Sequence, residues 1–231
     1  MLAGSVIAAA QGITVSATVS LVNDGKKSRG GKAGNVVLWL TPVEGTAMDD
    51  LATPKAASHP RLVQRNKSFD PHVLIVPVGS VVEFPNRDPF FHNVFSLFDG
   101  KRFDLGLYEA GSVRNVVFDK PGISYIFCNI HAEMSAVVIA VTTPYYGMSD
   151  RHGEVTIPQV PPGRYTLRFW YEEALPETLK SLTREVTISA DAPSLGALHL
   201  PATTLALVHQ NLYGHDYPPP QPENSPGYER H

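Results

Sequence analysis

The chain has 231 residues, of which 43% are hydrophobic, and a formal net charge of -3. Lysine and arginine are scattered along it, so no basic surface is available for a phosphate backbone and we do not expect nucleic acid as a partner. The 20 prolines and 18 glycines indicate many short turns, and the length allows one large hydrophobic core or two smaller ones. These features predict an all-β protein with two domains.

Residues 1–10, MLAGSVIAAA, are apolar and end in small side chains, as the end of a secretory signal peptide does. An ordinary frayed N-terminus is the alternative interpretation. No other run approaches the roughly 18 apolar residues of a membrane span. We therefore expect a protein without a transmembrane segment that is periplasmic or otherwise exported.

The first strand signal is ITVSATVSLV at residues 13–22, where apolar and polar side chains alternate with period two. A long turn-forming stretch separates it from NVVLWLTPV at residues 35–43. This pattern predicts a β-hairpin with a loose connection. An irregular polar linker follows at residues 48–60.

Seven further strand signals follow the linker at short intervals, a spacing typical of a β-sandwich or barrel. They are RLVQRN, HVLIVPVG, SVVEFPN, HNVFSLF, VRNVVF, SYIFCNI and SAVVIAVT, between residues 61 and 142.

A second strand-rich segment begins near residue 154. Its strand signals are EVTIPQV, RYTLRFWYEE, REVTISA and GALHLP, and the turn PPG separates the first two. Within it LPETLKSL, residues 175–182, predicts one helical turn. Residues 213–231 are rich in proline and polar side chains and contain little to bury. We expect them to form a disordered tail.

The only cysteine, Cys128, is followed by His131 and then Met134 at intervals of three. A type 1 copper site needs two imidazole nitrogens, one thiolate and a weak axial thioether, so this segment supplies three of the four donors. His92, at the start of an apolar strand, is the candidate for the fourth. The alternative is a packed strand that ends in soft side chains. The other histidines show no paired spacing that would indicate a second metal centre.

The stretches VLIVPVGSVVEFPNRDPFFHNVFS and YIFCNIHAEMSAVVIAV resemble the cupredoxins, small blue copper electron carriers that include amicyanin and plastocyanin. The C-x-x-H-x-x-M spacing is similar to that of amicyanin, a cupredoxin of methylamine utilisation. The resemblance implies a Greek-key β-sandwich with one type 1 copper per chain, bound by His92, Cys128, His131 and Met134. It also implies that Asn93 ties the two ligand-bearing segments together, with its backbone N–H directed at the cysteine sulfur.

Three aromatic residues, Phe91, Phe95 and Phe127, are candidates to exclude water from such a site, but an ordinary core position is the more typical role of each. The polar stretch after His92 either covers the site or forms a surface loop. Glu133, beside His131, departs from the apolar surface that the family presents to its redox partners.

Residues 153–167, GEVTIPQVPPGRYTL, resemble the hairpin of a transthyretin-like module of the carboxypeptidase regulatory type, with Tyr165 as its anchor. This resemblance implies a discontinuous module, residues 12–57 plus 148–201, with the cupredoxin domain of residues 58–147 inserted in it. Separate domains in tandem are the alternative.

The function implied by these resemblances is electron transfer between periplasmic redox partners, such as a dehydrogenase or a cytochrome. No substrate is transformed, so we do not expect an enzyme. A copper-binding protein for metal delivery or storage, and a structural protein with a vestigial site, are the alternatives.

Overall fold

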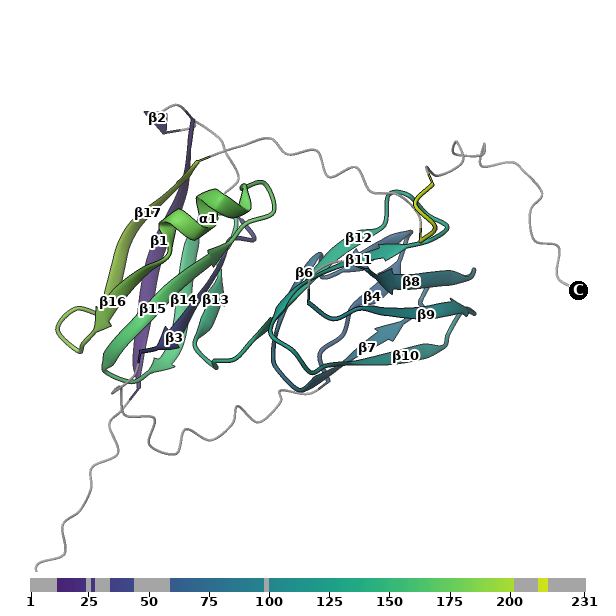
Figure 1. Ribbon diagram of the computed structural model, residues 1–231, viewed down its shortest axis with the longest axis horizontal. Coiled ribbons are helices and arrows are strands. Elements are labelled where there is room, and N and C mark those ends of the chain that lie inside the picture. The colour runs from purple at the N-terminus through teal and green to yellow at the C-terminus, as the bar shows by residue number, and fades with distance from the viewer. Residues whose placement is uncertain are drawn as a thin grey trace, which may run out of the picture. The chain divides into compact units, whose positions relative to one another are not determined.

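The computed structural model describes residues 12–23, 26–27, 34–43, 59–97, 100–201 and 212–215. In these ranges the regular structure is β-strand apart from one short helix, α1 (Pro176–Leu182) (Figure 1). The all-β prediction and the predicted helical turn are confirmed. Within the same ranges, no helix is long and apolar enough to cross a membrane. The expected signal remnant at residues 1–10 lies outside the described residues, as do residues 216–231 of the expected tail.

The described residues fall into two compact units. The first unit contains the described parts of residues 12–43 and 141–201, and the second contains those of residues 59–140 and 212–215. The boundary lies at Val141, ahead of the position expected from the sequence. The first unit therefore takes its strands from both sides of the second unit in the chain.

The first unit is built from two sheets. One has the order β14-β1-β17, with β2 beside β1; its strands are β1 (Ile13–Asn23), β2 (Lys26–Lys27), β14 (Glu154–Val160) and β17 (Ser194–Pro201). The other has the order β13-β3-β15-β16, with β3 (Val37–Pro42), β13 (Tyr146–Met148), β15 (Gly163–Trp170) and β16 (Arg184–Ile188). Alternate side chains of β1, from Val15 to Leu21, are buried in the core that the two sheets share, which confirms the period-two interpretation.

Both hairpins predicted for this unit are wrong. β1 pairs with β14 and β17, whereas β3 lies in the other sheet; likewise β14 and β15 pair with different neighbours. The connection from β14 to β15 is an arch that passes from one sheet to the other. Alternating side chains show that a strand buries one face, but either sheet of a sandwich provides such a buried face. Tyr165 fastens this arch, since its hydroxyl donates a hydrogen bond to the carbonyl of Pro161 over 2.8 Å.

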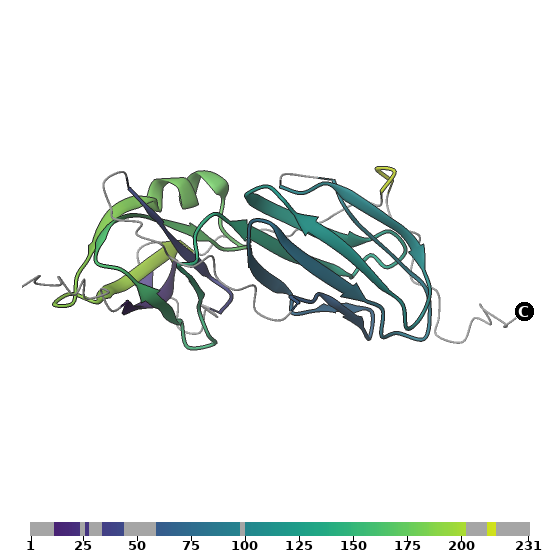
Figure 2. The same ribbon diagram turned by 90° about the horizontal axis from the view of Figure 1, so that it is seen from below.

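The second unit places a five-stranded sheet against smaller strand pairs (Figures 1 and 2). The large sheet has the order β6-β12-β11-β8-β9, with β6 (Val73–Pro77), β8 (His92–Ser96), β9 (Phe103–Tyr108), β11 (Gly122–Cys128) and β12 (Ser135–Val141). The pairs are β7 (Ser80–Pro85) with β10 (Val113–Phe118), and β4 (Val63–Arg65) with β5 (Ser68–Asp70). Phe84 and Phe118 from one layer share a core with Ile126 and Val138 from the other, so this unit is a sandwich.

Candidate metal centre

Two neighbouring strands bring His92 and Cys128 to the same end of the second unit. His92 is the first residue of β8, Cys128 is the last residue of β11, and Cys128 lies opposite Val94 in the antiparallel pair. The pairing continues beyond the strands, because the backbone N–H of Asn129 donates to the carbonyl of Asn93 over 2.9 Å. This hydrogen bond joins the two segments at Asn93.

A short loop then returns the chain from β11 to β12. The backbone N–H of Met134 donates to the carbonyl of His131 over 3.1 Å, and the N–H of Cys128 donates to the carbonyl of Met134 over 3.3 Å. The loop is therefore closed on itself. Its closure holds His131 and Met134 beside the end of β11.

The spacing of the donor atoms is that of ligands around a single ion. Cys128 Sγ lies 3.7 Å from His92 Nδ1 and 3.5 Å from His131 Nδ1, and one ligand atom from each residue lies within 4.8 Å of the others. Metal–nitrogen bonds of about 2.0–2.1 Å and metal–sulfur bonds of about 2.3 Å, at angles of about 110–120°, separate such atoms by about 3.5–3.8 Å. The side chains therefore already stand at ligand distances.

Burial distinguishes the members of the cluster. His92, Cys128 and Met134 are fully buried, and Met134 packs in the same core as Cys128. His131 is half-buried, so its imidazole is the part of the cluster that reaches solvent. A thiolate, two imidazoles and a buried thioether suit copper better than a hard cation such as Mg²⁺ or Ca²⁺.

The electrostatic environment favours neutral ligands. Burial is the main cause that lowers the pKa of both His92 and His131, so both imidazoles are unprotonated at neutral pH. Burial raises the pKa of the Cys128 thiol. The backbone N–H groups of Ile130, Asn93 and His131 stabilise the thiolate and offset part of this rise. A cation bound by Cys128 would supply the remaining stabilisation of the thiolate, because metal binding displaces the thiol proton.

The water-excluding aromatic groups differ in part from those expected. Phe95 and Phe127 are buried with ring centroids 5.9 Å apart, but Phe91 is 43% exposed, so its expected role is wrong. Phe90 takes that place, because its ring lies 5.3 Å from the His92 ring and 5.4 Å from the His131 ring. The polar side chain of Asp88 also reaches the cluster: its Oδ2 lies 2.9 Å from His92 Nε2. Sequence reasoning missed both Phe90 and Asp88.

The polar stretch after His92, expected to be a cover or a surface loop, is partly a strand of the large sheet. It contains β9, which pairs with β8 along its edge. Asp104 in this strand accepts a hydrogen bond from the side chain of Asn93 over 2.9 Å. The residue next to the first candidate ligand is thus held by β9 as well as by the ligand loop.

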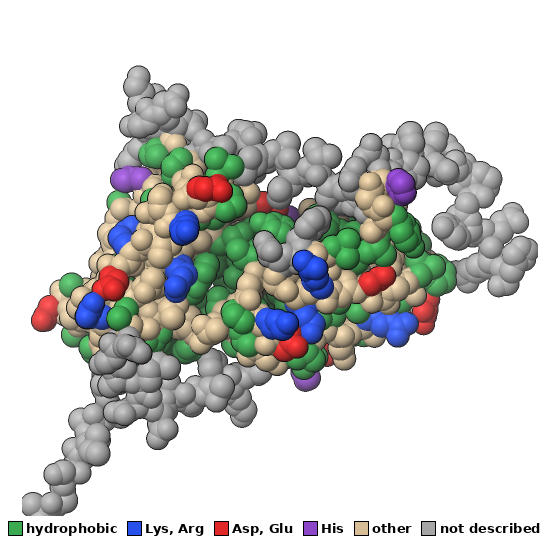
Figure 3. All heavy atoms as spheres, viewed as in Figure 1, with side chains coloured by type: hydrophobic (Ala, Val, Ile, Leu, Met, Phe, Trp, Pro, Cys, Tyr) green, Lys and Arg blue, Asp and Glu red, His purple; other side chains and the backbone are tan. Residues whose placement is uncertain are grey.

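The surface near the ligand loop carries apolar side chains. Ile130 is 44% exposed beside His131. Figure 3 shows hydrophobic side chains gathered on the second unit next to the turn formed by residues 212–215. This turn touches the loop, because the backbone N–H of Leu212 donates to Asn129 Oδ1 over 2.7 Å.

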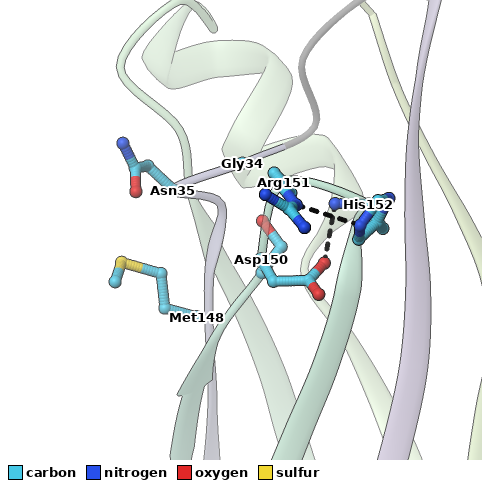
Figure 4. Close-up of a pocket in the computed structure, with 7 residues that line it drawn as sticks. Gly34, Asn35, Met148, Asp150, Arg151 and His152 are labelled. Atoms are coloured by element: carbon cyan, nitrogen blue, oxygen red, sulfur yellow. Dashed lines mark hydrogen bonds between the residues drawn. The ribbon is translucent and has the colours of Figure 1, made fainter.

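A pocket of about 620 Å³ lies in the first unit, lined by Gly34, Asn35 and residues 148–152 (Figure 4). Its polar groups bond to one another: Asp150 Oδ1 accepts the backbone N–H of His152 over 2.8 Å, and Arg151 Nε donates to His152 Nε2 over 3.0 Å. Among the described residues, the one cluster of His, Cys, Asp or Glu able to hold a metal is His92, Cys128 and His131. The second unit therefore carries the stronger candidate site.

No protein-family model and no curated protein matches the chain. Among solved structures, the chain is similar to a copper-containing nitrite reductase from Thermus scotoductus SA-01, with 26% identity and a TM-score of 0.35 over 36% of this chain. That match spans only 22% of the nitrite reductase chain. A purple cupredoxin from Nitrosopumilus maritimus is 22% identical, with a TM-score of 0.32 over 36% of this chain and 99% of its own. An amicyanin variant in the reduced state is 19% identical, with a TM-score of 0.34 over 37% of this chain and 85% of its own.

Proposed function

We propose that this chain is a type 1 copper protein that transfers single electrons. The observation that carries the proposal is the position of two imidazole nitrogens 3.5 and 3.7 Å from one buried cysteine sulfur. His92, Cys128 and His131 would hold the ion, with Met134 as the weak axial donor. Copper bound there would supply a Cu(II)/Cu(I) couple.

The protein's own contribution is rigidity. His92 and Cys128 belong to paired strands, and Met134 is fully buried in the core. Close-packed side chains resist displacement, so the donor positions change little when the charge of the centre changes by one. Little movement of the ligands favours fast electron exchange.

The electron would pass through His131. This imidazole is half-buried, whereas the other three candidate ligands are fully buried. Exposed Ile130 lies next to it in the loop, and Phe91, also exposed, lies next to His92. A redox partner protein would dock on this apolar surface, with exposed Glu133 favouring a partner that presents a positive charge there.

The first unit takes no part in this chemistry. We propose that it is an accessory module of the transthyretin-like type, which binds or spaces other components. The arch between β14 and β15, and the hydrogen bond of Tyr165 to the carbonyl of Pro161, support this assignment.

The test is a titration of the purified protein with one equivalent of Cu(II), followed by visible and electron paramagnetic resonance spectra. We expect an intense visible band and narrow copper hyperfine splitting. A colourless protein that binds Cu(I) tightly would instead support metal delivery, and a protein that binds neither ion would refute both functions. His152→Ala, which removes a histidine of the first unit, is the matched control and should leave the spectra unchanged.

A further inference from the structure

Asp88 is a carboxylate with almost no access to water. Asp88 is 4% exposed, and each of its two carboxylate oxygens accepts at least one hydrogen bond. Oδ1 accepts the backbone N–H of Asn66 over 2.6 Å. Oδ2 accepts the backbone N–H of Lys67 over 3.0 Å and lies 2.9 Å from Nε2 of His92. A buried carboxylate needs hydrogen-bond partners, and Asp88 has them in the backbone on one side and in the His92 ring on the other.

The two backbone donors belong to the tight turn between β4 and β5. Arg65 pairs with Ser68 across this turn, and the two central residues, Asn66 and Lys67, have φ values of 55° and 52°. Positive φ at both central positions defines a type I′ turn, in which the backbone geometry is closely restricted. The position of the carboxylate is therefore set by a rigid piece of backbone.

The carboxylate determines which nitrogen of His92 carries the proton. Both oxygens of Asp88 already accept backbone N–H groups, an arrangement that stabilises the ionised carboxylate. An ionised carboxylate only accepts hydrogen bonds, so Nε2 of His92 must donate. Nδ1 is then unprotonated, and it is the nitrogen 3.7 Å from Cys128 Sγ.

We propose that Asp88, held by the turn at Asn66 and Lys67, is a positioning residue that presents Nδ1 of His92 to copper and lowers the reduction potential of the site. The inference rests on the proposed function where it concerns copper. Its statement about the proton on His92 holds for the metal-free protein as well.

The effect on the potential follows from charge. A fixed negative charge on the far side of a ligating imidazole makes the ligand more basic and favours the more positive oxidation state. Loss of such a partner weakens metal binding about 10- to 100-fold. If Asp88→Asn weakens Cu(II) binding tenfold more than Cu(I) binding, the potential rises by about 59 mV.

A purely structural role for Asp88 is the competing explanation, because the same carboxylate joins the β4–β5 turn to β8. That role predicts a less stable variant with an unchanged proton position and potential. Asp119→Asn is the matched control: it removes a carboxylate of the second unit whose partner is Lys101 Nζ, at 3.0 Å, rather than a candidate ligand or a neighbour of one. It should leave the His92 proton and the potential unchanged.

The first experiment uses the metal-free wild-type protein, in which nitrogen-15 NMR assigns the imidazole proton of His92. We expect the proton on Nε2. A proton on Nδ1, or a mixture of both forms, would overturn the proposal whether or not the protein binds copper. Protonation at Nε2 in a protein that binds no copper would instead refute the proposed function and leave the positioning of His92 standing.

The second experiment compares wild type, Asp88→Asn and Asp119→Asn in the copper form. We expect Asp88→Asn to raise the reduction potential and to lower Cu(II) affinity at least tenfold. An unchanged potential in a folded Asp88→Asn protein would overturn the proposed effect on copper. Should that variant fail to fold, Asp88→Glu, which keeps the charge but shifts the carboxylate, replaces it and is expected to change the potential.

Discussion

The backbone N–H of Leu212 donates a hydrogen bond to the side-chain oxygen of Asn129, the residue that directly follows Cys128. Residues 213–215, expected from the sequence to belong to a disordered tail, form part of the turn that this bond attaches to the ligand loop. Asn129→Ala removes the acceptor but keeps the backbone bond to Asn93. We expect a loss of about 1 kcal/mol or less and faster hydrogen exchange at the Leu212 amide. Unchanged exchange at that amide would show that the bond does not hold the turn.

Replacing Cys128 with serine should abolish the intense visible colour of the copper form. The absorption requires charge transfer between a thiolate and Cu(II), and a hydroxyl of similar size cannot provide it. The measurement is the visible spectrum at saturating Cu(II). Full colour in the variant would remove Cys128 from the ligand set.

Replacing Met134 with leucine should preserve copper binding and raise the reduction potential. The axial donor tunes the potential, and its loss destabilises Cu(II) more than Cu(I). Because leucine has a similar volume, the folding cost at this fully buried position should stay below about 1.5 kcal/mol. Voltammetry of the variant measures the shift. Met148→Leu, at a methionine that is 38% exposed in the first unit, is the control, and equal shifts in both variants would contradict an axial role.

The first unit should lose stability at alkaline pH. Burial, together with the neighbouring Tyr145, raises the pKa of Tyr165 to about 12. The unfolded chain releases this proton near pH 10, so the stabilisation is complete below about pH 10 and declines as the pH rises towards 12, by up to about 2 kcal/mol. Urea unfolding across this pH range measures the decline.

Tyr165→Phe should reduce that alkaline decline but not remove it, because burial also raises the pKa values of Tyr145 and Tyr171 in the same core. At neutral pH it should cost about 1 kcal/mol, since the hydrogen bond to the carbonyl of Pro161 is lost. Tyr213→Phe, at a residue that is 73% exposed, should follow the wild-type pH dependence. Identical slopes for wild type and Tyr165→Phe would mean that other groups cause the decline.

The strands could be predicted from the sequence because burial of one face imposes a period of two, as in β1. The candidate ligands Cys128, His131 and Met134 could be found because they share one short loop. The pairing of strands could not, since β1 and β3 show the same alternation whichever sheet they join. In the irregular segment before β8, no periodicity indicates that Phe90 rather than Phe91 faces the cluster.

Asp88 was missed for a different reason. Its role depends on a turn 21 and 22 positions earlier in the chain, at Lys67 and Asn66, and on the placement of that turn by tertiary contacts. A signal was present nonetheless: an Asn-Lys pair between two short strands, and an aspartate four positions before His92.

The first unit is built from two separate parts of the chain, and this affects how it folds during synthesis on the ribosome. Thr18 on β1 lies opposite Glu154 on β14, 136 positions later, and β17 is still further on. Apart from its short pairing with β2, β1 must wait until these partners emerge, whereas strands β4 to β12 of the second unit become available sooner. Exposed strand edges invite association with other chains. Substitutions that delay assembly of the second unit should therefore lower the yield of the whole protein, including those that leave its final stability unchanged.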